Sequence, residues 1–578
     1  MTDTQPQRLP APDPPSLHDF EPLLLAELIV LRAAARGDIA KVGYRRPRSP
    51  TPDVRLRAEF LAFLARGGSD EAPVVGRRLQ IMGACVIGRL DLAGATLPMS
   101  LWLYRCTFGA VPLLDGARVL GSLSFSDSAL PGLHAEGCRV DGELAISAGC
   151  SIDGEIRLGR SRVGGDLNCE RLRMRGGTQA ARALRRTFVA DGMRIGGDVN
   201  LQGGVETVGE VRFVGAQIDG DLRAGTAHLT ADIDAAGTRG VALNLDRVRI
   251  GGSVVLDRGF SAAGTVRMQQ ARIRGDLDCS GAAFDTVGDA SWGECGSALR
   301  LDRAHIGGAL VLRGLQGPLQ GASLADARVG TLADDPGSWG QHHVLDGFAY
   351  TRFGADAPTD AAARLDWLTR QDASHVDLDF RPDPWRRAIH VLRRMGHDKG
   401  ASGLSIGRER HLRSIGRIGL GAPPALRWLA RLGHDAWGLF AGYGQRLWRL
   451  PVIGAIVWLL CGSAYWAAAE RGGFAPGAWA AADARLAACR TDCARLPAGV
   501  PRFQPFVYSL DVLLPLADLR QQRHWAPARD ALVPEAEAWL GVPLLQLLIW
   551  CEATCGWALA LTWLAALFGA GDRRLSSA

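Results

Sequence analysis

Apolar and polar residues alternate along short stretches of this chain, and the stretches recur. In "MRIGGDVNLQGG" (193–204), Ile195, Val199 and Leu201 share one parity, and "VRIGGSVVLDRG" (248–259) and "AHIGGALVLRG" (304–314) repeat the phrase. A period of two residues is typical of a strand that buries one face. Each phrase therefore predicts a short strand with glycine at its corner.

The apolar residue before the glycine corner marks each repeat. These marker residues are Ile87, Val119, Val140, Val163, Ile195, Ile218, Ile250, Ile273, Ile306 and Val329. From Val140 onward the steps alternate between 23 residues and 32 or 33 residues. Such self-similarity predicts a mainly β fold, a parallel β-solenoid, whose ten coils would stack to about 48 Å at ~4.8 Å per coil.

The longer alternate step adds residues at one corner of the coil. The added stretches fall in 175–192, 223–240 and 285–299, and we expect them to loop out on one face. Stacked insertions on one face are a usual place for binding in repeat proteins, so this insertion face could receive a cytosolic protein partner. The alternative, that the insertions are loops without function, stays open.

The remaining pattern divides the chain into further segments. Residues 1–75 are expected to form an N-terminal helical cap, which covers one end of the solenoid at 76–335. Residues 336–450 are expected to be helical. Within them, "PWRRAIHVLRRMGHDKGASGLSIGRERHLRS" (384–414) predicts a helical hairpin around a glycine turn.

Two apolar stretches are long enough to cross a bilayer. Residues 451–469 contain no charged residue. Residues 540–571 contain one, Glu552. Both predict transmembrane helices. Either the second span begins after Glu552, or Glu552 faces the first helix or a polar pathway.

Charge is unevenly distributed. Lysine and arginine total 66 against 60 acids, a net charge of +6, which does not indicate nucleic acid. Residues 381–449 hold fourteen of the basic residues against four acids. The positive-inside rule then predicts that the solenoid and both termini lie in the cytoplasm, with this arginine-rich segment against anionic lipid.

The segment between the spans, residues 470–537, is then expected outside the cytoplasm. Cys489 and Cys493 could form a disulfide there. The stretch "PFVYSLDVLLPLADLRQQRHWAP" (505–527) is apolar enough to re-enter the membrane, and Asp511 and Asp518 are its acids. In an oligomer these acids could form a ring in a pore, or they could simply cap and solvate the loop.

Motifs for chemistry are not evident. The glycine phrases lie inside strand repeats with no helix after them, which differs from a dinucleotide-binding turn. No Cys-x2-Cys pair and no histidine pair at helical spacing is present. We therefore predict no catalytic, cofactor-binding or metal-binding residue. Cys169 and Cys279 occupy equivalent repeat positions and are expected to be small apolar core residues.

Several of these stretches together resemble a bacterial family described as membrane-associated oxidoreductases. The resemblance rests on "RIGGDVNLQGG", "GSALRLDRAHIGGALVLRG", "VLDGFAY" (344–350), "PDPWRRAIHVLRRMGHDKGAS" and "YSLDVLLPLADL", and it covers about residues 75 to 571. It implies this architecture, a bacterial inner membrane and an oxidoreductase label, without catalytic residues to transfer. Three hypotheses follow: a membrane-anchored scaffold, a two-span pore or transport element, or an oxidoreductase.

Overall fold

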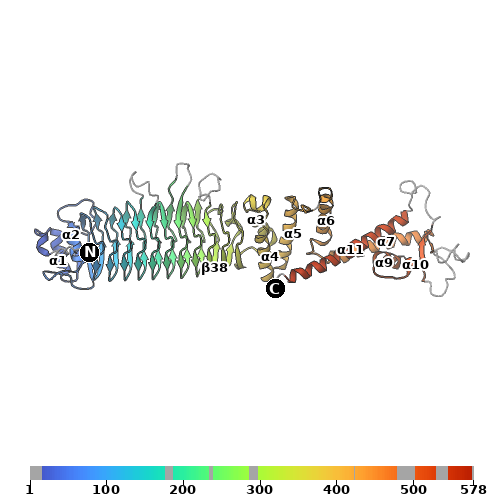
Figure 1. Cartoon of the computed structure of the whole chain (residues 1–578), viewed down its shortest axis with the longest axis horizontal. Helices are drawn as coiled ribbons and strands as arrows, with labels where there is room; N and C mark the ends of the chain where they lie inside the picture. The colour runs from blue at the N-terminus through green and yellow to red at the C-terminus, as the bar shows by residue number, and fades with distance from the viewer. Residues whose placement is uncertain are drawn as a thin grey trace, which may run out of the picture. The chain divides into compact units, whose positions relative to one another are not determined.

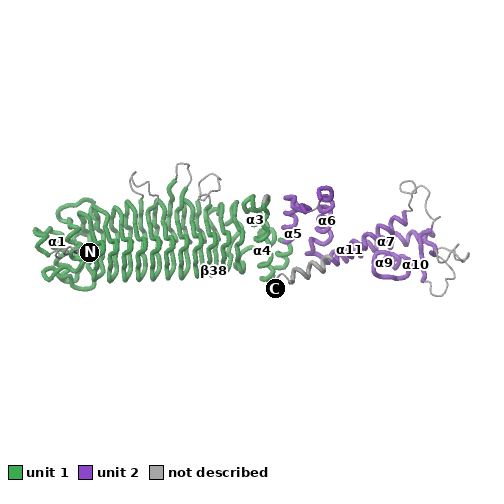
Figure 2. Tube along the Cα trace, in the orientation of Figure 1, with its two compact units in different colours: residues 1–404 green, residues 405–578 purple. Residues whose placement is uncertain are grey.

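The computed structural model describes residues 16–175, 186–233, 239–285, 297–421, 423–477, 501–528 and 544–575. The chain divides into two compact units, Met1–Leu404 and Ser405–Ala578 (Figure 2). The first unit contains the glycine-rich repeats. The second contains both apolar stretches.

Unit 1 is built from three parallel sheets of 21, 10 and 7 strands. The chain visits them in a fixed order. One passage runs through β22 (Arg194–Ile195) and β23 (Val199–Asn200) in the large sheet, then β24 (Glu206–Val208) and β25 (Glu210–Arg212) in the two smaller ones. We call one such passage a coil. Each strand pairs in parallel with its equivalent in the next coil, as the row of arrows in Figure 1 shows.

The stack extends beyond the predicted 76–335 at both ends. Strand β1 (Ile39–Lys41) pairs with β5 (Arg78–Met82), so the region predicted as a helical cap also supplies strands. At the other end β39 (Arg328–Asp334) pairs with β40 (Ala349–Phe353). Helices α1 (Leu25–Ala34) and α2 (Ala58–Ala65) belong to the N-terminal part, and α3 (Ala361–Thr369) and α4 (Asp383–Arg394) follow the last strand.

The interior of the coils is filled by the marker residues. From Val119 to Val329 every marker is at most 4% exposed, whereas Ile87 is partly exposed. Cys169 and Cys279 are both fully buried and free, which confirms their prediction as core residues. Burial raises the pKa of both thiols above the ordinary range. A thiol that stays protonated is a poor nucleophile and a poor metal ligand.

The glycine corner holds a second column of equivalent residues, which carry an Asp or Ser oxygen. Asp198 Oδ1 accepts a hydrogen bond of 2.9 Å from the backbone N–H of Asp221, its equivalent one coil later. Other coils repeat this bond. In them the backbone N–H is accepted by the side-chain oxygen of Ser100, Ser122, Asp166, Asp221, Ser253 or Asp276. The side chain of one coil thus satisfies a backbone donor of the next, which the sheets leave unpaired.

The glycine two residues after the marker makes room for that oxygen. A Cβ on Gly220 would lie 2.1 Å from Asp198 Oδ1, and one on Gly197 would lie 1.9 Å from Asp166 Oδ1. Neither glycine has a positive φ, so the requirement is the close approach of the oxygen and not the backbone conformation. This explains why glycine recurs two residues after the marker, at Gly142, Gly165, Gly197, Gly220, Gly252, Gly275 and Gly308.

The added residues lie between equivalent strands, so they are fewer than the predicted stretches 175–192 and 223–240, which also contain strand residues. They lie between β20 (Arg173–Met174) and β21 (Arg186–Val189), between β28 (His228–Thr230) and β29 (Val241–Asn244), and between β36 (Ala283–Asp285) and β37 (Leu299–Arg300). Each pair runs from the 10-stranded to the 7-stranded sheet. The insertions therefore leave one corner of the coil, although most of their residues lie outside the described part.

Helices account for more of the chain than a mainly β fold implies. Strands make up 28% of the residues, and the "mainly β" prediction was overstated because the C-terminal third is helical. The predicted hairpin is present as α4 and α5 (Asp398–Ser414), with Gly396 between them at φ +80. The remaining helices are α6 (Arg427–Ala441), α7 (Arg449–Glu470), α9 (Pro505–Leu513), α10 (Gln521–His524) and α11 (Leu544–Leu575).

A buried polar cluster lies beyond the last coils. The guanidinium of Arg364 makes two hydrogen bonds to Asp334, of 2.7 and 2.9 Å, and both residues are 1% exposed. Trp339 Nε1 donates to the same carboxylate at 2.8 Å. Beside it, the ring of His343 is fully buried against Trp339, and burial lowers the pKa of His343 to about 4.

We predict that Gly220→Ala destabilises the stack by about 1–3 kcal/mol, because the added methyl displaces the Asp198 carboxylate from the N–H of Asp221. Gly159→Ala is the matched control. Its Cβ would meet only Asp191 O, at 3.8 Å. Thermal unfolding of the full chain in detergent, followed by circular dichroism, measures both. Equal midpoints for the two variants would contradict this account of the corner.

The buried His343 predicts loss of stability on acidification. The unfolded chain takes up a proton at this histidine near pH 6.5, whereas the folded chain resists it down to about pH 4. The neutral His343 therefore makes its full contribution to the free energy of unfolding above pH 6.5. That contribution falls by up to about 3 kcal/mol as the pH drops toward 4. In denaturant titrations across this window, His343→Phe should show a shallower fall than the wild type. An unchanged slope would show that other groups dominate.

Candidate functional site

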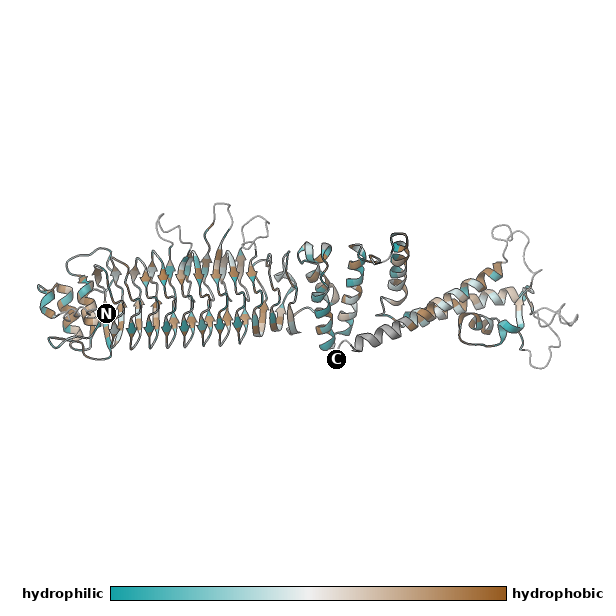
Figure 3. Cartoon of the chain, in the orientation of Figure 1, coloured by the Kyte–Doolittle hydropathy of each residue, from teal (hydrophilic) through white to brown (hydrophobic). Residues whose placement is uncertain are grey.

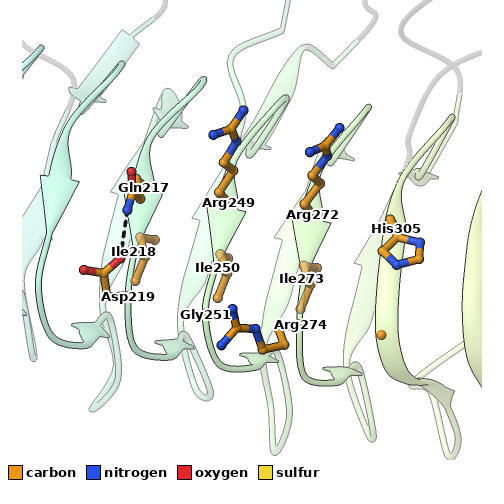
Figure 4. A pocket seen from close by; sticks show the side chains of 11 residues that line it. Gln217, Ile218, Asp219, Arg249, Ile250, Gly251, Arg272, Ile273, Arg274 and His305 are labelled. Atoms are coloured by element: carbon orange, nitrogen blue, oxygen red, sulfur yellow. Dashed lines mark hydrogen bonds between the residues drawn. The ribbon is translucent and has the colours of Figure 1, made fainter.

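One column of cationic side chains runs along the outer wall of the large sheet. It is formed by the residue before the marker in nine successive coils, and we call it the arginine ladder: Arg118, Arg139, Arg162, Arg194, Gln217, Arg249, Arg272, His305 and Arg328. All nine are exposed while their markers face inward. Seven of the nine positions are arginine. Figure 4 shows Arg249 and Arg272 extending side by side from neighbouring strands.

The ladder arginines are not neutralised. Among the described residues, only Arg118 has an acidic partner, Asp141, at 3.8 Å. Another wall of the same coils gives the comparison. In the 7-stranded sheet each arginine lies beside an acid, and we call these residues the paired column: Arg157 with Glu155, Arg212 with Asp191, Arg267 with Asp246, and Arg300 with Asp302.

A shallow groove runs beside the middle of the ladder. It has a volume of about 450 Å³ and is lined by Gln217, Asp219, Arg249, Arg272, Arg274 and His305 with backbone of the same strands. Gly251 and Gly307 also line it, and without side chains they leave the wall open there. Figure 4 shows the side chain of Arg274 on the opposite side of the marker residues from Arg249 and Arg272.

The side chains that line this groove are mostly cationic and suit anions. A guanidinium offers a planar set of donors that matches phosphate and carboxylate oxygens. The groove presents three such groups and one carboxylate, that of Asp219, which already accepts a hydrogen bond of 3.0 Å from Gln217. Across the described residues of the whole chain, no group of three His, Cys, Asp or Glu is placed to hold a metal ion.

Helix α6 in unit 2 has an unusual distribution of polar and apolar residues. Two of its polar side chains contact α5: Asp435, which lies at the edge of the apolar face, accepts two hydrogen bonds of 2.9 Å from Arg413, and His434 lies 3.5 Å from Glu409. Its apolar side is exposed. Trp428, Leu432 and Leu439 lie on one face at helical spacing and are 61, 58 and 67% exposed. A soluble protein would bury this face.

Two helices of unit 2 are long and apolar enough to cross a membrane, Arg449–Glu470 and Leu544–Leu564. They match the predicted spans at 451–469 and 540–571, and residues 540–543 lie outside the described part. Only 17% and 11% of the most apolar window in each are buried, and Figure 3 shows the hydrophobic residues along both.

Glu552 lies within the second of these helices and faces the first. It is 1% exposed, and each carboxylate oxygen has a hydroxyl partner. Tyr465 on α7 donates to Oε2 at 2.6 Å, and Ser509 on α9 bonds to Oε1. Of the two alternatives that the sequence left open, the structure supports the one in which Glu552 contacts the first helix. A single carboxylate thus joins α7, α9 and α11.

Asp511 and Asp518 lie in the segment between the two helices. Asp511 is buried, and its two oxygens accept from the backbone N–H groups of Leu519 and Gln522 at 2.7 and 2.8 Å. Asp518 accepts from the N–H of Arg520 and pairs with Arg523 at 2.8 Å. Both acids cap the loop. Cys489 and Cys493 lie outside the described residues.

The sequence analysis did not find the arginine ladder, although its signal is present. Arginine precedes the marker in seven of nine coils, but its meaning depends on the stacking that brings these residues into one column. The Asp and Ser column at the glycine corner was missed for the same reason.

No family model, no curated protein and no solved structure matches this chain.

We predict that Glu552→Leu lowers the thermal midpoint of unit 2 by removing the partner of both Tyr465 and Ser509. The Tyr465 hydroxyl, left without a partner, costs about 1–3 kcal/mol, while Ser509 keeps its bond of 3.2 Å to Trp458 O. Glu552→Gln keeps an acceptor and should lose less. Thr554→Leu is the control, since Thr554 is exposed on the same helix and bonds only to Cys551 O. Thermal unfolding in detergent gives the order; a midpoint for Glu552→Leu equal to that of Thr554→Leu would refute the joining role.

Proposed function

We propose that this chain is a membrane-anchored binding protein: a parallel β-solenoid held at a bacterial inner membrane by two transmembrane helices, and serving as a scaffold for a partner. In this proposal the coils of unit 1 are the solenoid and α7 and α11 are the spans. The resemblance to the membrane-associated family, from the sequence alone, agrees with this location.

The exposed apolar face of α6 is the observation that carries the membrane anchor. An amphipathic helix with polar side chains in contact with protein and an exposed apolar face suits the interface plane of a bilayer. It immediately precedes α7, the first candidate span. Three apolar helices, one lying in the interface and two crossing, account for most of the exposed apolar surface of unit 2.

The orientation follows from charge. The arginine-rich segment 381–449 precedes the first span, so the positive-inside rule puts it, the solenoid and both termini in the cytoplasm. The same residues would attract anionic lipid headgroups. Residues between the spans are then extracytoplasmic.

The scaffold role follows from where the coils offer space for a partner to bind. Their interior is filled by buried apolar side chains, and the described groove is open and shallow. A partner must therefore bind on an outer wall or at the corner from which the insertions leave, as in other repeat proteins. Oligomerisation would multiply such sites.

The membrane anchor predicts that a photo-crosslinking amino acid at Leu432 on the apolar face of α6 yields lipid adducts in intact membranes. The same residue at Arg431, which is exposed about 100° around the helix from Leu432, should yield fewer. Mass spectrometry of the labelled chain measures both.

The orientation is tested in parallel by an enzyme reporter active only outside the cytoplasm. Fused after residue 578, it should be silent; inserted near residue 490, it should be active. Release of the full chain from membranes by alkaline carbonate, or equal lipid labelling at the two α6 positions, would refute the anchor.

A further inference from the structure

We propose that the arginine ladder binds an extended, flexible polyanion of phosphate groups, laid along the axis of the coils. The inference concerns the partner of the scaffold described above, but it needs only the wall of unit 1 and not the membrane anchor.

The geometry of the ladder is linear. Parallel strands repeat at ~4.8 Å, so nine successive rungs span about 38 Å. This rung spacing is shorter than the ~8 Å over which physiological salt screens charge, so neighbouring guanidiniums repel one another and act together on an anion. The groove lined by residues from Gln217 to Gly307 lies beside the central rungs and gives a ligand room there.

The fold shows that such repulsion is avoidable. In the paired column, which runs through the same coils, the acids lie close: Arg212 is 2.7 Å from Asp191, and Arg267 is 2.7 Å from Asp246. Arg139, Arg162, Arg194, Arg249 and Arg272 have no ion pair among the described residues, and the one acid beside Arg139, Asp141, pairs with Arg118 at 3.8 Å. A row of like charges that is left uncompensated destabilises the sheet and is explained by a ligand.

The surroundings of the ladder favour a simple polyanion over other anionic surfaces. No rung is Phe, Tyr or Trp, and His305 is the one ring in the column, so bases of single-stranded nucleic acid would lack the row of stacking platforms that usually binds them. Between Arg118 and Arg328 the large apolar residues that are strongly exposed are Leu120, Val208 and Ile233, and none is a rung, so the ladder lacks the apolar anchors that α6 offers a bilayer. Arginine, with its forked donors, suits phosphate oxygens.

The test uses inorganic polyphosphate, fluorescently labelled, and the full-length chain in nanodiscs of zwitterionic lipid. The ladder variant is Arg249→Gln with Arg272→Gln, and the matched control is Arg267→Gln with Arg300→Gln in the paired column. Both remove two positive charges from the same group of coils. Fluorescence anisotropy over a range of salt gives Kd and its salt dependence, and thermal unfolding checks that both variants are folded.

We expect the wild type to bind, and the ladder variant to bind on the order of tenfold more weakly, with the slope of log Kd against log salt shallower by about two. The control should stay within about twofold of the wild type. Equal loss in both variants, or no loss in the ladder variant, overturns the site.

Competition identifies the occupant. Single-stranded DNA and anionic vesicles are added as competitors. The choice of a simple polyanion is overturned if either one displaces labelled polyphosphate at a lower phosphate concentration than unlabelled polyphosphate does, and only when the ladder is intact. Because binding is measured on the purified chain, its failure leaves the lipid labelling of α6 unaffected, and failure of the membrane anchor leaves this result unaffected.

Discussion

The structure of unit 1 depends on one constraint, that every residue lies directly beneath its equivalent in the next coil. The hydrogen bond from the N–H of Asp221 to Asp198 Oδ1 requires this register, and so does the empty space at Gly220 into which the carboxylate fits. A slip of one residue would turn the buried markers outward and leave a row of backbone donors unpaired. The interior and the corner therefore reinforce one another, since both depend on the same alignment.

The same register decides the electrostatics of the outer walls. A residue type that recurs in the repeat becomes a column, so small differences between walls are multiplied by the number of coils. In the 7-stranded sheet the recurring arginine comes with a nearby acid and the wall is close to neutral. In the large sheet the recurring arginine comes without one. Two faces of one fold thus differ in charge although their backbones are built alike.

Much of this architecture could be read from the sequence because it depends on local pattern. Parity identified Ile195 and Ile250 as interior residues, and long stretches with no charge or a single charge identified the two apolar helices. The rest depends on contacts between distant residues. Glu552 meets Tyr465 across 87 positions of sequence, and only the packing of α7 on α11 resolves which of two alternatives holds. Arg249 likewise has no ion pair because the neighbouring coils bring no acid close to it among the described residues, and this is visible only in the folded chain.

Because the longer and shorter steps alternate, the natural module of this protein is a pair of coils and not a single one. The stretch from Ile195 to Arg249 is one such module: it contributes two rungs of the ladder, one insertion and two interior layers. Joining Arg194 directly to Ile250 would restore every column in register. Whole modules can accordingly be lost or duplicated without disturbing the interior, which makes the length of the charged wall, and with it the reach of the protein along a ligand, adjustable in fixed increments.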